Sequence, residues 1–307
     1  MDIMKRTLSF LCFIVFACLK VDAQQTPQFS QNMFNKLANN PGFAGSMEAI
    51  CATALHRQQW IGFGDGRPVT TNLSVDAGIP SIFGGVGLNI VNETIGQYDN
   101  LGLQLSYAYR KELGNGQIGT GISLGVYQSS LDGTSLNPAS SGDPALPTAD
   151  AQGSALDVGF GVYFNNEDAY IGLSSSNITE PTIEWENATT QKLVRHYYLI
   201  SGYYHQISNT ISLNPSIFLK SDGVTSQLDI NTNLIYDDKI WGGLSYRLGE
   251  SIVILSGMNI TEDLKFGVSY DVVVNSIKQN SLEFMLGYCF KINYDKPVSK
   301  YKNPRFL

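Results

Sequence analysis

The chain has 307 residues, of which 43% are hydrophobic and 15% are charged, and its formal net charge at pH 7 is −7. An acidic chain without a basic stripe is a poor candidate for a nucleic-acid-binding protein, because phosphates are bound by clustered Lys and Arg side chains. After residue 23, no apolar run approaches the roughly 18 residues that a membrane-spanning helix needs, which excludes helical membrane spans.

The first 23 residues are typical of an export signal. Lys5 and Arg6 form a short basic region, and residues 8–19 are an almost unbroken apolar run that is followed by a small-x-small motif. Such a run is too short to span a bilayer, but it matches the apolar region and cleavage site of a signal peptide. We therefore predict a signal peptide over residues 1–23. A buried N-terminal helix and lipoprotein processing at Cys18 are the alternatives.

From residue 47 onward, apolar and polar residues alternate. In residues 69–77, for example, Leu73 and Val75 fall on one face and Asn72 and Ser74 on the other. Strict alternation indicates strands, and turn sequences rich in Gly, Asn and Asp separate the runs every ~15 to 25 residues. About fourteen strands are predicted, near residues 47–57, 68–79, 84–95, 98–111, 116–129, 153–165, 168–176, 192–207, 210–220, 224–236, 239–248, 250–259, 264–274 and 281–291.

Two all-β architectures fit such strands: a soluble sandwich and a transmembrane barrel. The predicted strands exceed the 5–6 residues or so that are typical of a sandwich. In lipid an open sheet edge would leave backbone groups unpaired, so the sheet must close, with its polar face inward. We predict an all-β, closed antiparallel barrel over residues 47–307, behind a periplasmic or plug segment at residues 24–46. Candidates for the interfacial aromatic girdles are Tyr107, Tyr109, Tyr197, Tyr198, Tyr203, Tyr204, Tyr246 and Tyr288.

Two segments stand out within this pattern. Residues 131–153 form the longest irregular insert and suit an extracellular loop. Pro215 lies inside a predicted strand, where a residue without a backbone N–H requires a sheet edge or a bulge.

The search for catalytic and metal-binding motifs finds no nucleophile elbow, phosphate loop or zinc-binding His pair. His56, His196 and His205 lack ligand spacing and are interpreted as lumen or girdle residues, and carboxylates on the polar face are explained by a wet lumen. The sequence therefore predicts no enzymatic activity, no cofactor and no metal.

Cys51 and Cys289 fall in the first and last predicted strands. Closure would make these strands neighbours, so a disulfide across the seam is geometrically possible. Two separate thiols are the favoured interpretation, since two cysteines are no disulfide framework.

One set of motifs is unusual for a barrel. Residues 27–35 read PQFSQNMFN, residues 40–45 read NPGFAG and residues 57–63 read RQQWIGF. Further motifs lie at residues 87–96, 195–198, 214–216, 241–247, 285–288 and 303–306. As a set they resemble the PorP/SprF family of Bacteroidetes outer-membrane proteins, which belongs to the type IX secretion and gliding machinery.

The resemblance implies a non-enzymatic barrel in the outer-membrane lipid that works with periplasmic ring and peptidoglycan-linking proteins. Such barrels support the export or surface attachment of cargo, including gliding adhesins. The aromatic residues before and after the first strand would either pack as a plug or hairpin at the periplasmic mouth, or dock a secretion partner. The candidate partner-binding residues are Phe29, Phe34, Phe43, Arg57, Trp60 and Phe63.

Two other functions compete with this one. An outer-membrane channel or hydrophobic-solute transporter would share the barrel and the signal peptide. A soluble, exported sandwich that binds carbohydrate would share only the signal peptide and the alternation.

Overall fold

The strands of the computed structural model follow the predicted runs closely. The structure describes residues 26–47, 49–136, 149–185, 191–275 and 279–291. Its strands are β1 (Ala49–Gln58), β2 (Val69–Ile79), β3 (Gly84–Ile95), β4 (Tyr98–Leu113), β5 (Gly116–Leu131), β6 (Ala151–Asn165), β7 (Ala169–Ser176), β8 (Thr182–Ile183), β9 (Gln191–Lys192), β10 (His196–Tyr203), β11 (His205–Ser208), β12 (Ile211–Ser221), β13 (Ser226–Tyr236), β14 (Ile240–Arg247), β15 (Ser251–Asn259), β16 (Leu264–Val273) and β17 (Ser281–Lys291). Three short 3₁₀ helices accompany them: η1 (Asn32–Phe34), η2 (Pro41–Phe43) and η3 (Pro80–Ile82). Among the described residues, no helix is long and apolar enough to cross a membrane.

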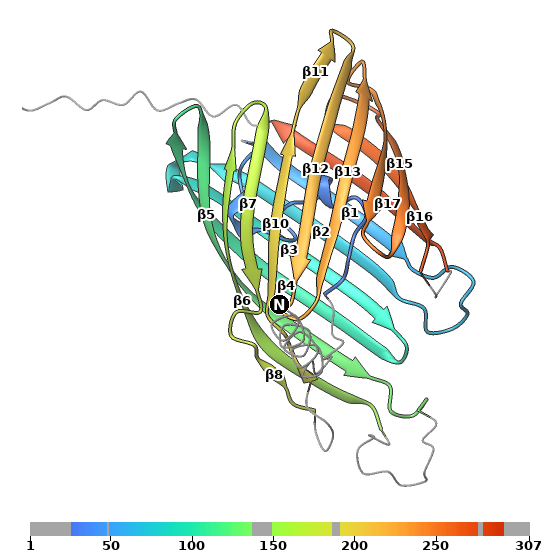
Figure 1. Ribbon diagram of the computed structural model, residues 1–307. Helices are drawn as coiled ribbons and strands as arrows, with labels where there is room; N and C mark the ends of the chain where they lie inside the picture. The colour runs from blue at the N-terminus through green and yellow to red at the C-terminus, as the bar shows by residue number, and fades with distance from the viewer. Residues whose placement is uncertain (1–25, 48, 137–148, 186–190, 276–278, 292–307) are drawn as a thin grey trace, which may run out of the picture.

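The large sheet closes on itself as a barrel (Figure 1). Adjacent strands of this sheet pair antiparallel, β1 pairs with β17, and β10 pairs with both β7 and β12. Because β10 and β11 both pair with β12, they act as one interrupted strand, and the barrel has 14 strands. The predicted closed barrel is thus confirmed. A small second sheet of β8 and β9 was not predicted.

The interruption between β10 and β11 lies opposite Pro215. Pro215 pairs with Thr232 on the β13 side of β12, whereas on the other side Ser216 pairs with Gly202 and Leu213 pairs with His205. A proline has no N–H to donate to the ladder. The strand that faces it is therefore broken at Tyr204, which satisfies the predicted need for an irregularity.

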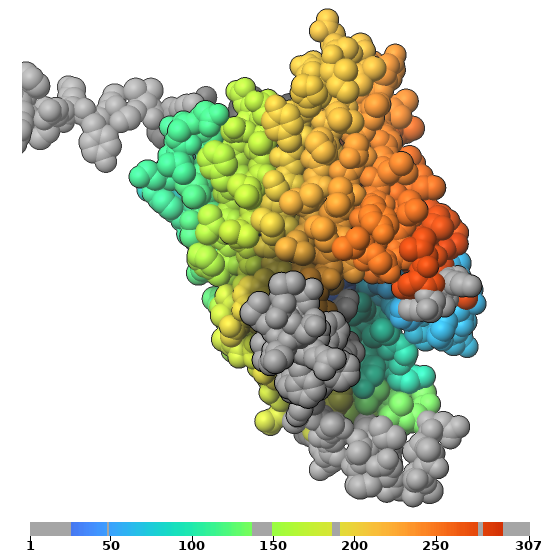
Figure 2. Space-filling model, in the orientation of Figure 1, coloured from blue at the N-terminus to red at the C-terminus, as the bar shows by residue number. Residues whose placement is uncertain are grey.

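The two faces of the sheet differ as the alternation predicted. Outward-pointing Leu73 and Leu105 are exposed, whereas Asn72 and Ser74 on the neighbouring positions are buried in the lumen. Figure 2 shows the outer wall from β7 to β15 as a continuous surface. A closed sheet with an apolar exterior leaves no unpaired backbone edge in hydrocarbon, which is the requirement for a membrane-spanning barrel.

Six of the eight tyrosines predicted for the girdles point outward and are exposed: Tyr107, Tyr109, Tyr197, Tyr203, Tyr246 and Tyr288. Tyr204 instead points toward Asn214 on the lumen side, so its prediction is wrong. The prediction for Tyr198 is wrong too. Its side chain is 7% exposed and lies in the lumen, where it packs near Phe218. The reason is the strand period, since Tyr197 already occupies the outward position and its neighbour in β10 must point inward.

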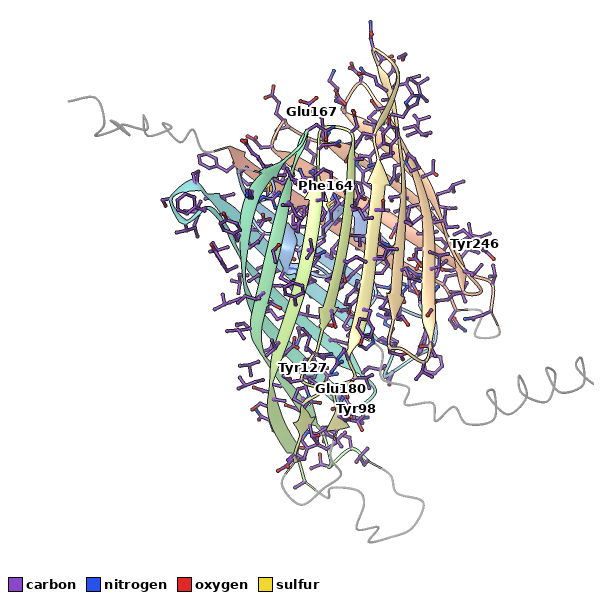
Figure 3. The ribbon with its side chains drawn as sticks, turned by 60° about the vertical axis from the view of Figure 1, so that its left-hand side comes forward. Tyr98, Tyr127, Phe164, Glu167, Glu180 and Tyr246 are labelled. Atoms are coloured by element: carbon purple, nitrogen blue, oxygen red, sulfur yellow. A yellow bond between two sulfur atoms is a disulfide. The ribbon has the colours of Figure 1, made fainter. Side chains whose placement is uncertain are left out.

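The two ends of the barrel carry connections of different length. At the end where β17 finishes, the connections are short: residues 80–83, 114–115, 166–168, 209–210, 237–239 and 260–263. We call this the short-turn end. The opposite, long-loop end carries residues 59–68, 96–97, 132–150, 177–195, 222–225, 248–250 and 274–280. In Figure 3, Tyr98, Tyr127 and Glu180 mark the long-loop end, and Phe164 and Glu167 mark the short-turn end.

A disulfide bond between Cys51 and Cys289 crosses the seam of the barrel. The two residues are direct partners in the pairing of β1 with β17, with their Cα atoms 4.1 Å apart. The favoured prediction of two separate thiols is therefore wrong. The sequence places both cysteines in seam strands but does not give the register that sets them opposite each other.

Candidate functional site

Residues 26–47 run through the lumen from the long-loop end to the short-turn end, and we call them the plug (Figure 1). Lys220, near the long-loop end of β12, donates to the carbonyl oxygen of Thr26 at 3.1 Å. At the other end of the lumen, the N–H of Gly45 donates to a carboxylate oxygen of Asp76 at 2.9 Å. Among the described residues, every hydrogen bond between the plug and the strands involves a side chain. The plug is therefore packed in the barrel without being one of its strands.

Ser30 of the plug lies at the centre of a buried ionic network. Its hydroxyl donates to Asp271 at 2.8 Å and accepts from Arg57 at 2.8 Å and from Arg247 at 3.2 Å. The carboxylate of Glu283 accepts the backbone N–H groups of Ser30 and of the next residue, at 2.8 and 2.9 Å. Two adjacent backbone donors on one carboxylate form charge-assisted hydrogen bonds, which are about twice as strong as neutral ones.

The wall residues of this network also pair with one another. Arg57 contacts Asp271 at 2.7 Å and Glu283 at 3.2 Å, and Arg247 contacts Asp271 at 3.1 Å. Arg247 also reaches Asp229 at 3.2 Å, and all five of these side chains are at most 3% exposed. Desolvated charges of this kind are tolerated because each is paired and hydrogen-bonded, and removal of one partner costs about 3–5 kcal/mol.

An apolar cluster lies next to the network and holds the same part of the plug. Phe29 and Met33 are buried against residues of the surrounding strands, and Phe34 lies 4.6 Å from Trp241, measured between ring centroids. The wall side of the cluster consists of Leu55, Trp241, Val253, Leu255 and Met285. Residues 26–34, which we call the arm, are thus held by both charge and apolar contact.

The second half of the plug lies against glycines of the barrel wall. A Cβ atom on Gly121 would lie 2.4 Å from the carbonyl oxygen of Pro41, and one on Gly85 would lie 2.4 Å from the Cα atom of Gly45. Gly161 leaves similar room for the side chain of Asn40. Side chains other than hydrogen at these positions would overlap the plug. The lumen wall of β3, β5 and β6 therefore contains a glycine groove that receives the plug.

The candidate partner-binding residues fall into two groups. Phe29, Phe34, Phe43 and Arg57 all lie in the lumen, where they contact or hold the plug. Trp60 and Phe63 lie in the connection between β1 and β2 at the long-loop end, where their rings are 5.8 Å apart. Phe63 is 57% exposed. The structure therefore does not bring the six residues into one site.

Sequence reasoning did not single out Arg247, Asp271 or Glu283 as site residues. Asp229 and Glu283 are among the carboxylates on the predicted polar face, which were explained by a wet lumen. The sequence did contain an indication of this network. Charged residues recur at lumen-facing positions near the long-loop ends of β13, β14, β16 and β17. Only the register between strands shows that these charges meet.

The long-loop end has a second packed region outside the plug. β4, β5 and β6 have 16, 16 and 15 residues, against 8 for β14, so one side of the barrel is taller than the other. On the lumen side of this tall wall, Ile183 and Trp185 pack against Leu131. The indole N–H of Trp185 donates to the carbonyl oxygen of Ser129 at 3.2 Å. In the part of the chain that the structure describes, no group of His, Cys, Asp and Glu residues could hold a metal ion.

Comparison with known proteins gives a family match. The model of a family described as "Type IX secretion system membrane protein PorP/SprF" matches residues 21–288. No curated protein matches.

Solved structures of outer-membrane proteins are similar in fold, at low sequence identity. The outer membrane protein Omp33 of Acinetobacter baumannii is 9% identical, with a TM-score of 0.46, and the match covers 79% of this chain and 98% of that one. The toluene transporter TbuX of Ralstonia pickettii is 13% identical, with a TM-score of 0.47 over 83% and 93% of the two chains. A FadL homologue of Pseudomonas aeruginosa is 12% identical, with a TM-score of 0.45 over 88% and 95%.

Proposed function

We propose, from the premise that this chain belongs to the PorP/SprF family of type IX secretion system membrane proteins, that it supports the export or surface attachment of secreted cargo. In this role it acts by binding other proteins and not by catalysis. The observation that carries the proposal is the plug. A lumen occupied from end to end by residues 26–47 favours a barrel that works through its two ends over one that passes solutes freely.

The proposed location is the outer membrane of a Gram-negative bacterium, reached through a signal peptide at residues 1–23. Bacterial outer-membrane barrels have short periplasmic turns and longer extracellular loops. The short-turn end would then face the periplasmic ring and peptidoglycan-linking proteins, and the long-loop end would face the cargo. Trp60 and Phe63 are therefore proposed as cargo-side contacts, whereas Phe29, Phe34 and Phe43 hold the plug.

A deletion strain tests the function. Loss of the gene should abolish the surface display of one or more secreted proteins, and gliding where the organism glides, while uptake of small solutes is unchanged. Retained surface display with loss of solute uptake alone would reject the secretion role in favour of a channel or hydrophobic-solute transporter.

A point variant tests the long-loop end separately. Phe63→Ser removes an exposed ring without altering the packed lumen, and Tyr203→Phe on the outer wall serves as its control. The first should reduce cargo display in the complemented strain and the second should not. Equal display in both, with equal amounts of folded barrel, would exclude Phe63 from the docking surface.

A further inference from the structure

We propose that the lumen site around the arm is a peptide-binding site, and that the arm is its resident ligand, which a segment of a secreted polypeptide displaces. The inference deepens the proposed function, because it names the chemistry of the partner. The binding site itself is argued from the contacts of residues 26–34 and does not depend on secretion.

The site binds the arm as a receptor binds a peptide. Glu283 holds two consecutive backbone N–H groups, so that part of the recognition is independent of side chains. Asp271 and the two arginines Arg57 and Arg247 bind one hydroxyl, that of Ser30. The apolar cluster takes Phe29 before the hydroxyl and Met33 three positions after it. The fitting ligand is therefore a peptide segment with an aromatic residue, then Ser or Thr, then an aliphatic side chain or Met three residues later.

The fit of the arm is incomplete, which leaves room for a better ligand. Buried polar atoms of the wall, on the strands that carry the network, have no hydrogen-bond partner among the described residues: Asn231 Oδ1, both side-chain polar atoms of Asn233, Ser245 Oγ and Ser269 Oγ. On their strands, Asn231, Ser245 and Ser269 precede or follow a network residue by two positions and share its lumen-facing side. A buried polar group without a partner loses free energy relative to a hydrogen-bonded one, so a ligand that hydrogen-bonds these groups binds more tightly than the arm does.

The arm can also leave without unfolding the barrel. Its bonds to the wall involve side chains, so its departure breaks no strand pairing. Thr26 lies at the long-loop end, so the arm can leave through that end without crossing the lumen. The glycine groove holds the second half of the plug separately, around Pro41 and Gly45. An arm tethered in this way competes at a high effective concentration, which protects the site from weak ligands.

Binding of a labelled peptide to the purified, full-length protein in detergent tests the proposal. The probe is a fluorescent peptide with the sequence of residues 26–36, and the readout is fluorescence polarisation. The receptor is the variant Phe29→Ala/Met33→Ala, whose arm is weakened while the wall is intact. It should bind the peptide saturably, and the wild-type protein should bind it at least about tenfold more weakly because its own arm occupies the site.

Two matched changes test the specificity of the site. Glu283→Gln added to the receptor should weaken binding about tenfold or more, because a charge-assisted pair of hydrogen bonds is lost. The same peptide with Ser30→Pro, which lacks one of the two N–H groups, should not bind. Heat-modifiable migration in gels verifies that each receptor is folded.

Three results would overturn the inference. The first is a folded receptor that does not bind the peptide. The second is binding that is unaffected by Glu283→Gln and by the proline peptide. The third is dimerisation of the receptor with the wild-type protein, seen by light scattering, which would make a second copy's arm the occupant. A deletion strain that exports normally would reject the proposed function but would leave these binding results intact.

Discussion

Cys51 and Cys289 lie directly opposite each other on β1 and β17, and their disulfide joins the first and last strands of the barrel. Elsewhere along the seam, the two strands are held by the same backbone pairing as any other neighbours. The covalent bond lies near the short-turn end, where the chain leaves the plug and enters β1. It therefore fixes the register of closure at the point where the plug is attached.

The double variant Cys51→Ser/Cys289→Ser should form the same barrel with lower stability. Because the link closes a very long loop of the chain, we expect a loss of about 2–4 kcal/mol. The measurement is the denaturant concentration at which the heat-modifiable, folded band disappears from gels. Wild-type protein treated with a reductant should shift in the same direction. An unchanged midpoint in both would show that backbone pairing alone holds the seam.

The glycine groove predicts that one added methyl group can disturb the plug. In Gly121→Ala the new Cβ would lie 2.4 Å from the carbonyl oxygen of Pro41, so the plug must shift, at a cost of about 1–3 kcal/mol. Gly242→Ala is the control, since its nearest neighbour atom lies 3.8 Å away. The expected result is a lower unfolding midpoint, and faster proteolysis of the plug, in the first variant only. Equal unfolding midpoints and equal proteolysis rates of the two variants would mean that the plug is not in close contact with β5.

The strands could be predicted from the sequence because alternation is a local property. Each run carries its own pattern. Closure of the sheet follows because an open edge in lipid would leave backbone N–H and C=O groups without hydrogen-bond partners. The register between distant strands is not local. Arg57 and Asp271 are 214 residues apart, and nothing near either residue in the sequence shows that they form an ion pair. The ionic network and the disulfide could therefore not be predicted from the alternation of apolar and polar residues.

The tyrosines show where a local rule was applied too loosely. Tyr197 and Tyr198 cannot both point outward from one continuous strand, so the prediction for Tyr198 conflicted with the period of two. The same holds for Tyr203 and Tyr204, since the ring of Tyr203 stacks with that of His205 on the outer face, whereas Tyr204 points toward Asn214 on the lumen side. The period of two therefore continues across the interruption opposite Pro215.

A double-mutant cycle tests the ionic network. Arg247→Met leaves the carboxylates of Asp229 and Asp271 buried without their shared cation, so we expect a loss of about 3–5 kcal/mol. The second change, Asp229→Asn, removes one of those charges. The double variant should therefore be more stable than the sum of the two single losses predicts, by about 0.5–3 kcal/mol. Unfolding by urea in detergent provides the free energies, and strict additivity would show that Arg247 and Asp229 are not coupled.

Tyr197 and Tyr198 form a matched pair that tests the inward and outward faces of β10. Tyr198→Ala should cost about 3–5 kcal/mol, because its ring packs in the lumen near Phe218 and its hydroxyl lies 3.1 Å from that of Thr26. Tyr197→Ala removes a ring of the same size from the outer face and should cost less, since no lumen cavity is created. Tyr198→Phe separates the hydroxyl from the ring and should lose about 0.5–1.5 kcal/mol. The unfolding midpoints of the three variants in detergent decide the assignment. A larger loss for Tyr197→Ala than for Tyr198→Ala would reverse the faces of this strand, and with them the contact between the arm and the wall.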